Sequence, residues 1–445
     1  MNNIQLIISY FLVGFLFTAT TFAQGPVVPV PAPVQAQKIV LTGGIAHVGN
    51  GQVIENSVIV LDGGKIAAIG DGRTLKVDAR DALIFDINGK HVYPGLIAAA
   101  TALGLSEIAA VRATQDRNET GDLNPNVRSI IAYNTDSEVL PTLRSNGLLM
   151  AQITPQGGII SGQSSIVQLD AWNWEDATTK ADDGIWLNWS QMFTFEGWWA
   201  EQGGIKPNEK YSEQVDMIKA FFEEAKAYCQ SKNHSEANLK MEAMCGLFSG
   251  TKKLYVNVNY VKEIVDVVNF AKSYGVQLVI SGGTDAWKVA DLIKENRVAV
   301  IVNQTHSLPN REDEDFDLPY RLPKLLQDAG IPYCITIGAG YDGYWQQRNL
   351  PFQAGTAAAF GLTKEQALSA ITLNAAKILG IEQSVGSLEQ GKDATLIISK
   401  GDVLDMRSSL VEYAFIQGRQ IDLDNKQKAL YRKFMGKFGL RPIQE

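Results

Sequence analysis

Histidine and cysteine are both scarce in this chain, which has 4 histidines and 3 cysteines among 445 residues. An odd and small number of cysteines excludes a scaffold built on many disulfides. Basic residues form no continuous stripe, and the formal net charge is −8. A mildly acidic surface of this kind favours solubility and gives no sign of nucleic-acid binding.

The chain has enough apolar residues for a large core, because 45% of its residues are hydrophobic and 20% are charged. That is the composition of an ordinary globular protein. A length of 445 residues exceeds one minimal domain and suits one large barrel with a smaller satellite domain.

The N-terminus predicts export. Residues 4–22 are mostly apolar, and Thr21 and Ala23 are small residues at the two positions that a signal peptidase reads. We expect residues 1–23 to be a signal peptide and the proline-rich residues 24–37 to be an extended linker. An uncleaved membrane anchor is the alternative, because the apolar run approaches the ~18 residues that a spanning helix needs. The prolines favour cleavage, and hence a periplasmic or secreted protein.

The cysteines leave one question open. Cys229 and Cys245 flank a polar stretch, and an oxidising compartment would permit a disulfide between them. Two unrelated thiols are an equally good interpretation. Cys334 lies in an apolar, strand-like segment and is expected to be a buried core thiol.

Short strand-like segments separated by glycine-rich turns occur near both ends of the chain, over residues 38–86 and again from residue 385. Neither half buries both of its faces alone. We therefore expect residues 38–92 and 384–424 to form one small composite β-sandwich. Residues 425–445 read as a basic amphipathic helix or tail with a solvated face.

Between these parts, residues 93–383 alternate strand and helix, which indicates parallel strands with right-handed crossovers. This predicts an α/β fold with a (β/α)8 TIM-like barrel, and a doubly wound sheet is the alternative. The expected strands are 95–100, 148–153, 254–258, 276–280, 298–302 and 335–337. The expected helices are 211–227, 261–274, 285–295, 322–330 and 363–379.

Several motifs occur in a recognisable order. They are Lys90-His-Val-Tyr-Pro-Gly-Leu-Ile97, Asn349-Leu-Pro-Phe352, Ser369-Ala-Ile-Thr-Leu-Asn-Ala-Ala376 and Gly386-Ser-Leu-Glu-Gln-Gly-Lys-Asp-Ala394. Together they resemble the amidohydrolase superfamily, in its imidazolonepropionase-like branch, over about residues 38–417. The resemblance implies that the barrel begins near residue 93. It also implies a hydrolase that cleaves a non-peptide C–N bond in a small cyclic amide or a similar molecule.

The resemblance also implies a metal centre. One or two Zn-type ions would polarise the substrate carbonyl and lower the pKa of a bound water to about 7. In the family the ligands lie at the carboxyl ends of strands: a His-x-His pair on the first, a Lys or Glu on the fourth, single histidines on the fifth and sixth, and an Asp on the eighth. Residues i and i+2 of a strand point to the same face, so the pair would enter the barrel mouth together.

This chain departs from that pattern. Ala100 and Ala102 occupy the pair positions, Asn257 the fifth-strand position and Gly282 the sixth. His-x-His occurs nowhere in the sequence, and residues 163–168 contain no Lys or Glu. His306 follows a predicted barrel strand and is the one histidine expected to reach the mouth. Asp342 is the candidate general base, and a carboxylate capping a turn is an equally good interpretation.

Two further features have ordinary alternatives. The acidic run 311–317 offers hard oxygens for Ca²⁺, but such runs are usually solvated. Six tryptophans between Trp172 and Trp199 suit either an aromatic binding platform or the attachment of a long insertion, and the second is favoured.

Three functional hypotheses follow. The first is an exported hydrolase of the kind that the resemblance implies. The second is a metal-free pseudoenzyme that binds a small molecule or glycan, or acts as an assembly module in the cell envelope. The third is a structural partner of an active paralogue. We predict no cofactor, a small-molecule ligand in the barrel mouth, no nucleic acid, no stable membrane span after signal cleavage, and a possible homo-oligomer.

Overall fold

The computed structural model describes residues 30–198, 201–231, 234–338, 340 and 343–441. Contacts divide the chain into Met1–Val30 and Pro31–Glu445, and the second unit is described below. The predicted signal peptide, 1–23, and residues 24–29 of the predicted linker lie outside the described residues.

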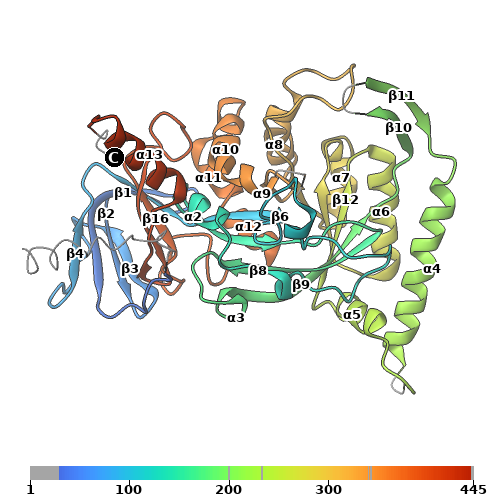
Figure 1. Cartoon of the computed structure of the whole chain (residues 1–445), viewed down its shortest axis with the longest axis horizontal. Coiled ribbons are helices and arrows are strands. Elements are labelled where there is room, and N and C mark those ends of the chain that lie inside the picture. The colour runs from blue at the N-terminus through green and yellow to red at the C-terminus, as the bar shows by residue number, and fades with distance from the viewer. Residues whose placement is uncertain (1–29, 199–200, 232–233, 339, 341–342, 442–445) are drawn as a thin grey trace, which may run out of the picture. The chain divides into compact units, whose positions relative to one another are not determined.

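An eight-stranded sheet forms the centre of this unit (Figure 1). Its strands follow the order β15-β14-β13-β12-β9-β8-β7-β6. Thr336, directly after β15, donates a hydrogen bond from Oγ1 to the carbonyl oxygen of Ala99 on β6 and thereby links the two edges of a nearly closed barrel. The predicted TIM-like fold is confirmed. The strands are β6 (Leu96–Thr101), β7 (Leu148–Ile153), β8 (Ile160–Gln168), β9 (Thr178–Asn188), β12 (Lys253–Val258), β13 (Leu278–Gly282), β14 (Ala299–Val302) and β15 (Tyr333–Ile335).

One strand of the barrel runs against the others. β8 is antiparallel to both β7 and β9, whereas the remaining hydrogen-bonded neighbours are parallel. The connections before and after β8, residues 154–159 and 169–177, are shorter than the dozen residues that a parallel crossover needs. The prediction of parallel strands is therefore wrong for β8.

The helices of the barrel bury one face each. In α6 (Val261–Tyr274), Ile264, Val267 and Ala271 recur at the spacing of one helix face and are buried. The helix ends at Gly275, whose φ of 68° is the left-handed conformation that glycine readily adopts at a helix end. The other helices of this part are α2 (Val139–Arg144), α3 (Trp174–Ala177), α4 (Tyr211–Gln230), α5 (Leu239–Phe248), α7 (Ala290–Glu295), α8 (Leu318–Ala329), α9 (Gly343–Gln346), α10 (Leu350–Ala359), α11 (Lys364–Ala370) and α12 (Leu373–Leu379). Short 3-10 helices are η1 (Arg112–Thr114), η2 (Ser129–Ala132), η3 (Ala286–Val289) and η4 (Gln347–Asn349).

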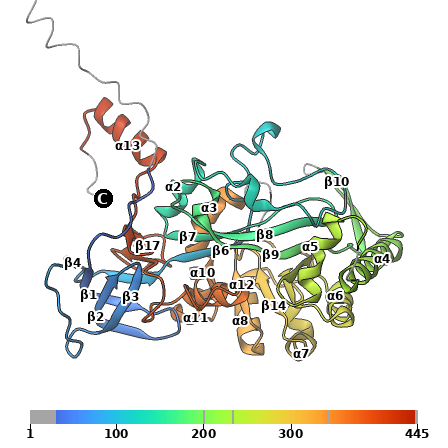
Figure 2. The same ribbon diagram turned by 90° about the horizontal axis from the view of Figure 1, so that it is seen from below.

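A second sheet joins the two ends of the sequence. Its order is β18-β17-β16-β5-β1-β2-β3, with β4 paired to β1, and Figure 2 shows the blue N-terminal strands beside the red β17. The link is the antiparallel pair β5–β16, in which Tyr93 lies opposite Ile397. The strands hydrogen-bond as one sheet, and the domain limits 38–92 and 384–424 stay a prediction. The strands are β1 (Ile39–His47), β2 (Val53–Asp62), β3 (Lys65–Asp71), β4 (Leu83–Asp86), β5 (His91–Pro94), β16 (Leu396–Ser399), β17 (Val411–Ile416) and β18 (Arg419–Gln420).

A buried ion cluster joins this composite sheet to the barrel. Asp170, which follows β8, is 2% exposed and accepts hydrogen bonds from Arg144 of α2 at 2.6 Å and from Arg419 of β18 at 3.0 Å. The backbone N–H of Ala32 also donates to this carboxylate, at 2.9 Å. Because Ala32 belongs to the predicted linker, the described end of that linker is held against the body of the protein.

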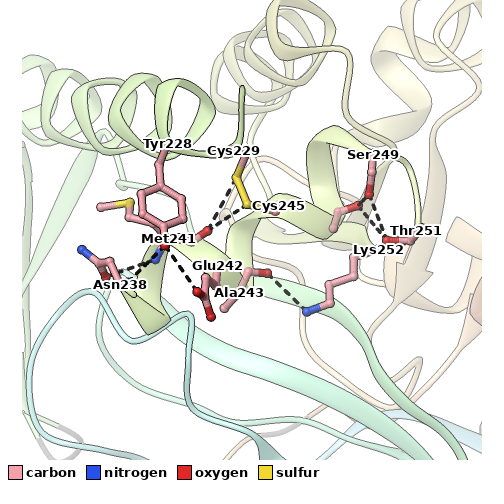
Figure 3. The surroundings of a disulfide bond; sticks show 11 residues. Tyr228, Cys229, Asn238, Met241, Glu242, Ala243, Cys245, Ser249, Thr251 and Lys252 are labelled. Atoms are coloured by element: carbon pink, nitrogen blue, oxygen red, sulfur yellow. Dashed lines mark hydrogen bonds between the residues drawn. A yellow bond between two sulfur atoms is a disulfide. The ribbon is translucent and has the colours of Figure 1, made fainter. Parts of the chain in front are cut away.

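A disulfide closes the polar segment between α4 and α5 (Figure 3). Cys229 near the end of α4 is bonded to Cys245 of α5, with their Cα atoms 5.3 Å apart. Of the two alternatives that the sequence leaves open, the structure has the disulfide, and Cys334 is a buried free thiol as expected. The hairpin of β10 (Phe193–Trp198) and β11 (Glu201–Pro207) precedes α4, and α13 (Lys426–Lys437) ends the described chain.

Candidate functional site

A cavity of about 520 Å³ opens at the carboxyl ends of β13, β14 and β15. Gly282 and Val302 end β13 and β14 at the cavity, and Gly338 lines it three residues after β15. Leu308 and Leu318 form part of its apolar wall. In barrels of this kind the carboxyl ends of the strands carry the functional residues, so this cavity is the candidate site.

The polar groups of the cavity are mostly uncharged amides. Among the residues that the structure describes, the side chains of Asn259, Asn303, Gln304 and Gln346 line it without a hydrogen-bond partner. The charged lining residue is Glu314, whose carboxylate contacts Arg311 at 2.5 Å and accepts the backbone N–H of Asn310 at 3.0 Å. The cavity therefore offers unsatisfied donors and acceptors but little net charge.

The first-strand positions of the family's metal site are closed. Ala100 and Ala102 are 2% and 0% exposed and carry no donor atom. β6 ends at Thr101, and Ala100 has a φ of 51°, so the regular i and i+2 geometry of a strand does not hold here. The backbone N–H of Ala100 donates to Oε1 of Gln152 at 3.2 Å. Neither alanine is among the residues that line the cavity.

The fifth-strand position is engaged in another interaction. Asn257 on β12 donates from Nδ2 to Oδ1 of Asn188, at the end of β9, at 2.7 Å. Asn188 in turn donates to the carbonyl oxygen of Gly158 at 2.8 Å and to Oγ of Ser161 at 3.1 Å. The amides thus tie β8, β9 and β12 together at the mouth, in place of a metal ligand.

The sixth-strand position has no room for a side chain. Gly282 has a φ of 98°, a conformation that favours glycine. A Cβ atom on Gly282 would lie 2.4 Å from Oδ1 of Asn259 and 3.1 Å from the carbonyl oxygen of Val258. The space that a histidine ring would enter is therefore filled by the amide of Asn259.

The two remaining candidates are not joined to this site. His306 contacts Oγ1 of Thr356 on α10 through Nε2 at 2.5 Å, and its backbone N–H donates to Oε1 of Gln353 at 2.8 Å. It is not among the residues that line the cavity, and burial lowers its pKa, which favours the neutral ring. Asp342, the predicted general base, lies outside the described residues.

The barrel interior holds a polar cluster that sequence analysis missed. Asp183 of β9 is 2% exposed and accepts hydrogen bonds from Ser164 at 2.5 Å, Tyr255 at 2.7 Å and Gln152 at 3.1 Å. Burial raises the pKa of Asp183. The indole of Trp186 stacks on the ring of Tyr255, with 4.9 Å between ring centroids. An acidic pair that leads into an apolar stretch, Asp182-Asp183-Gly184-Ile185-Trp186-Leu187, was the available signal, and it lies within β9.

The residues present do not fit the family's metal centre. Among the described residues, no group of three or more His, Cys, Asp or Glu side chains is placed to hold a metal ion. Four of the five assigned ligand positions carry two alanines, a hydrogen-bonded amide and a glycine. A Zn site needs three or four N, S or O ligands in close geometry, and these four positions offer no more than the amide of Asn257, which is hydrogen-bonded to Asn188.

The acidic run and the tryptophans have structural partners. Arg311 contacts Glu314 at 2.5 Å, and Arg321 contacts Asp315 at 2.7 Å and Asp317 at 3.0 Å, so ion pairs neutralise much of the run. Trp186 and Trp189 are buried, and Trp172 is 65% exposed. Trp199 lies outside the described residues.

Comparisons with known proteins agree with the fold. The Amidohydrolase family profile matches residues 196–421, just over half of the chain. An imidazolonepropionase of Flavobacterium psychrophilum is 25% identical over 240 residues, which are 46% of this chain and 58% of that protein. Another, of Thermoplasma volcanium, is 35% identical over 98 residues, which are 22% of this chain and 23% of that protein. The match thus spans little more than half of the first relative's length and less of the second.

A solved amidohydrolase from Thermotoga maritima MSB8 has a TM-score of 0.75 and 23% identity, over 86% of this chain and 99% of that one. At that identity the likeness concerns the fold alone. The relatives agree with the predicted imidazolonepropionase-like branch, and the family profile decides the wider assignment. The chain belongs to the amidohydrolase family.

Proposed function

We propose that this protein is an exported member of its family that binds a small uncharged polar molecule at the barrel mouth, without the family's binuclear metal centre. The observation that carries the proposal is the cavity between β13 and β15, whose unpaired polar side chains among the described residues are mostly amides. Amides of asparagine and glutamine present a donor and an acceptor side by side, so they suit ligands that have both and carry no charge.

The filled metal positions support this proposal over a metal-dependent one. Gly282 and Asn259 are arranged so that the amide takes the space of a sixth-strand ligand and faces the cavity instead. These amides are exposed or half-buried and have no hydrogen-bond partner within the described chain, so a ligand in the cavity can bond to them without displacing an intramolecular contact. A ligand in this cavity would be held by hydrogen bonds to amide side chains and not by a metal ion.

Two measurements test the proposal. Metal per chain, measured by mass spectrometry after incubation with Zn²⁺ and removal of free ions, should be near zero. A thermal-shift screen of neutral metabolites should give stabilising compounds whose affinity falls at least tenfold in Asn303→Leu. The matched control, Asn269→Leu on the exposed side of α6, should bind as the unaltered chain does. Retention of one or two ions per chain would overturn the metal-free proposal.

A hydrolase is the second candidate, because family membership favours it. It would cleave a non-peptide C–N bond of a small cyclic amide, with Asp342 as the proposed general base. A panel of lactams and cyclic ureides tests this idea, with Asp342→Asn as the variant. Turnover that survives this substitution would exclude Asp342 from the reaction, and the absence of turnover together with ligand binding would favour the pseudoenzyme.

Export is part of the proposal, and the Cys229–Cys245 disulfide supports it, because such bonds persist mainly in oxidising compartments. Alkylation of the unfolded chain isolated from cells should label one thiol, Cys334, before reduction and all three after it. Labelling of three thiols without reduction would place the chain in a reducing compartment.

The remaining proposals concern partners. Over the residues that the structure describes, no helix is both long and apolar enough to cross a membrane. We keep a homo-oligomer as a proposal, which light scattering of the purified chain tests.

A further inference from the structure

The C-terminal helix α13 and the residue after it carry a row of exposed apolar side chains. Leu430, Phe434 and Phe438 follow one another at intervals of four residues, so they lie along one side. They are 42%, 48% and 64% exposed. None of the residues of α13 is buried.

The same segment is strongly basic. No acidic residue occurs between Lys426 and Arg441, in a chain whose formal net charge is −8. At 3.6 residues per turn, Lys428, Arg432 and Lys433 point to the flanks of the apolar row or away from it. The basic residues of the segment are Lys426, Lys428, Arg432, Lys433, Lys437 and Arg441.

Side-chain contacts between the described part of the barrel and α13 lie at the start of the helix. Lys426 pairs with Glu138 at 2.6 Å, and Oε1 of Gln427 accepts a hydrogen bond from Thr142 of α2 at 2.9 Å. Arg432 pairs with Asp424, just before the helix, at 2.5 Å. The first turn is therefore attached to α2, whereas the side chains of the apolar row and those of Lys433 and Lys437 are exposed.

We propose that α13 docks on a membrane surface that carries anionic lipid headgroups. An amphipathic helix of this composition lies in the plane of the interface, with its apolar side chains among the acyl chains and its basic side chains at the headgroups. Lysine stems extend to the headgroup level beside the apolar row. The charge of the segment, opposite to that of the whole chain, selects an anionic surface. The proposal is independent of what the barrel cavity binds.

Sedimentation with lipid vesicles tests the proposal on residues 24–445, so that the apolar N-terminal run does not contribute. The vesicles are phosphatidylcholine alone or with phosphatidylglycerol. We expect binding to the anionic vesicles, weakened at least tenfold both in Phe434→Ser/Phe438→Ser and in Lys433→Glu/Lys437→Glu. The control Lys262→Glu/Lys272→Glu makes the same change of charge at exposed sites of α6 and should bind as the unaltered chain does.

Equal binding to neutral vesicles would overturn the role of charge, and loss of binding in the α6 control would show a nonspecific effect of net charge. No binding to either vesicle, with retention on immobilised polyglutamate, would overturn the proposal and indicate an acidic protein as the partner. Thermal unfolding of each variant, expected within 2–3 °C of the unaltered chain, checks that the fold is retained.

Discussion

Two aspartates, each 2% exposed, are stabilised by different means in two regions of the molecule. Asp170, where the barrel meets the composite sheet, contacts the guanidinium groups of Arg144 and Arg419. Asp183, inside the barrel, receives its hydrogen bonds from an amide and two hydroxyl groups. One carboxylate is matched by cations, and the other is surrounded by neutral donors.

The difference decides which form of each carboxyl group suits its surroundings. A carboxylate between two guanidinium groups balances charges that would otherwise be buried alone. A carboxyl group among neutral donors does not need to be charged to balance a neighbouring cation. Burial accordingly raises the pKa of Asp183 and favours its protonated form. Lys180 and Lys253 lower that pKa as smaller influences, and their ammonium groups donate to the backbone carbonyls of Leu379 and Ile378.

The largest effect is expected from Asp170→Asn. It removes the charge that compensates Arg144 and Arg419, whose side chains are 6% and 13% exposed. Loss of one partner of a buried ion cluster costs about 3–5 kcal/mol. Guanidinium unfolding of the variant measures the change in the free energy of unfolding.

The control for this substitution is Asp328→Asn, at an exposed pair. Asp328 contacts Lys324 one helical turn away, and the two side chains are 59% and 34% exposed. Such a pair contributes less than about 1 kcal/mol. Similar losses in both variants would mean that Asp170 acts as an ordinary surface charge, and the contrast drawn above would fail.

A smaller effect, about 1–3 kcal/mol at low pH, is expected from Asp183→Asn, which keeps the volume and replaces one acceptor by a donor. The loss should shrink as pH rises. Because the pKa of Asp183 is raised in the folded state, the folded chain binds more protons than the unfolded one above about pH 4. Stability from this group is therefore full below pH 4 and declines toward the raised pKa, whereas the asparagine variant lacks this titration.

Urea unfolding of the unaltered chain and of Asp183→Asn from pH 4 to pH 8 measures how the difference between their free energies of unfolding changes with pH. A difference in the free energy of unfolding that grows with pH would mean that the fold stabilises Asp183 as a carboxylate. Asp183 and Asp170 would then both be stabilised in their charged form.

The sequence predicted the elements of the barrel better than their directions. Apolar segments such as 148–153 and 254–258 are strands within a residue of the predicted ends. β8 and β9 were not among the expected strands. Alternation of apolar residues also does not encode strand direction, so the antiparallel pairing of β8 was not foreseen. The predicted helix 363–379 is interrupted at Ile371, whose carbonyl accepts the N–H of Ile97 on β6, a contact between segments distant in sequence.

The candidate site was predictable only in small part. Family motifs assigned Ala100, Ala102, Asn257 and Gly282 to ligand positions, and of these Gly282 lines the cavity. Asn259 fills the space beside Gly282 because this glycine has a left-handed backbone conformation. A glycine in the sequence allows that conformation but does not predict it. The cluster around Asp183 is formed by residues of β7, β8, β9 and β12, which are distant in sequence, so no local sequence pattern predicts it.

The smallest effect is expected from Tyr255→Phe, which isolates one neutral donor of Asp183. The ring still stacks on Trp186, so the variant loses the 2.7 Å hydrogen bond alone, at about 0.5–1.5 kcal/mol. The decline of stability with rising pH should extend to higher pH, because a carboxylate with one donor fewer is harder to form and the pKa of Asp183 rises further. Tyr413→Phe is the control, since the hydroxyl of Tyr413 has no hydrogen-bond partner among the described residues, and its stability should be unchanged. A loss in Tyr255→Phe as large as that in Asp170→Asn would mean that neutral donors stabilise a buried carboxylate as strongly as paired guanidinium groups do.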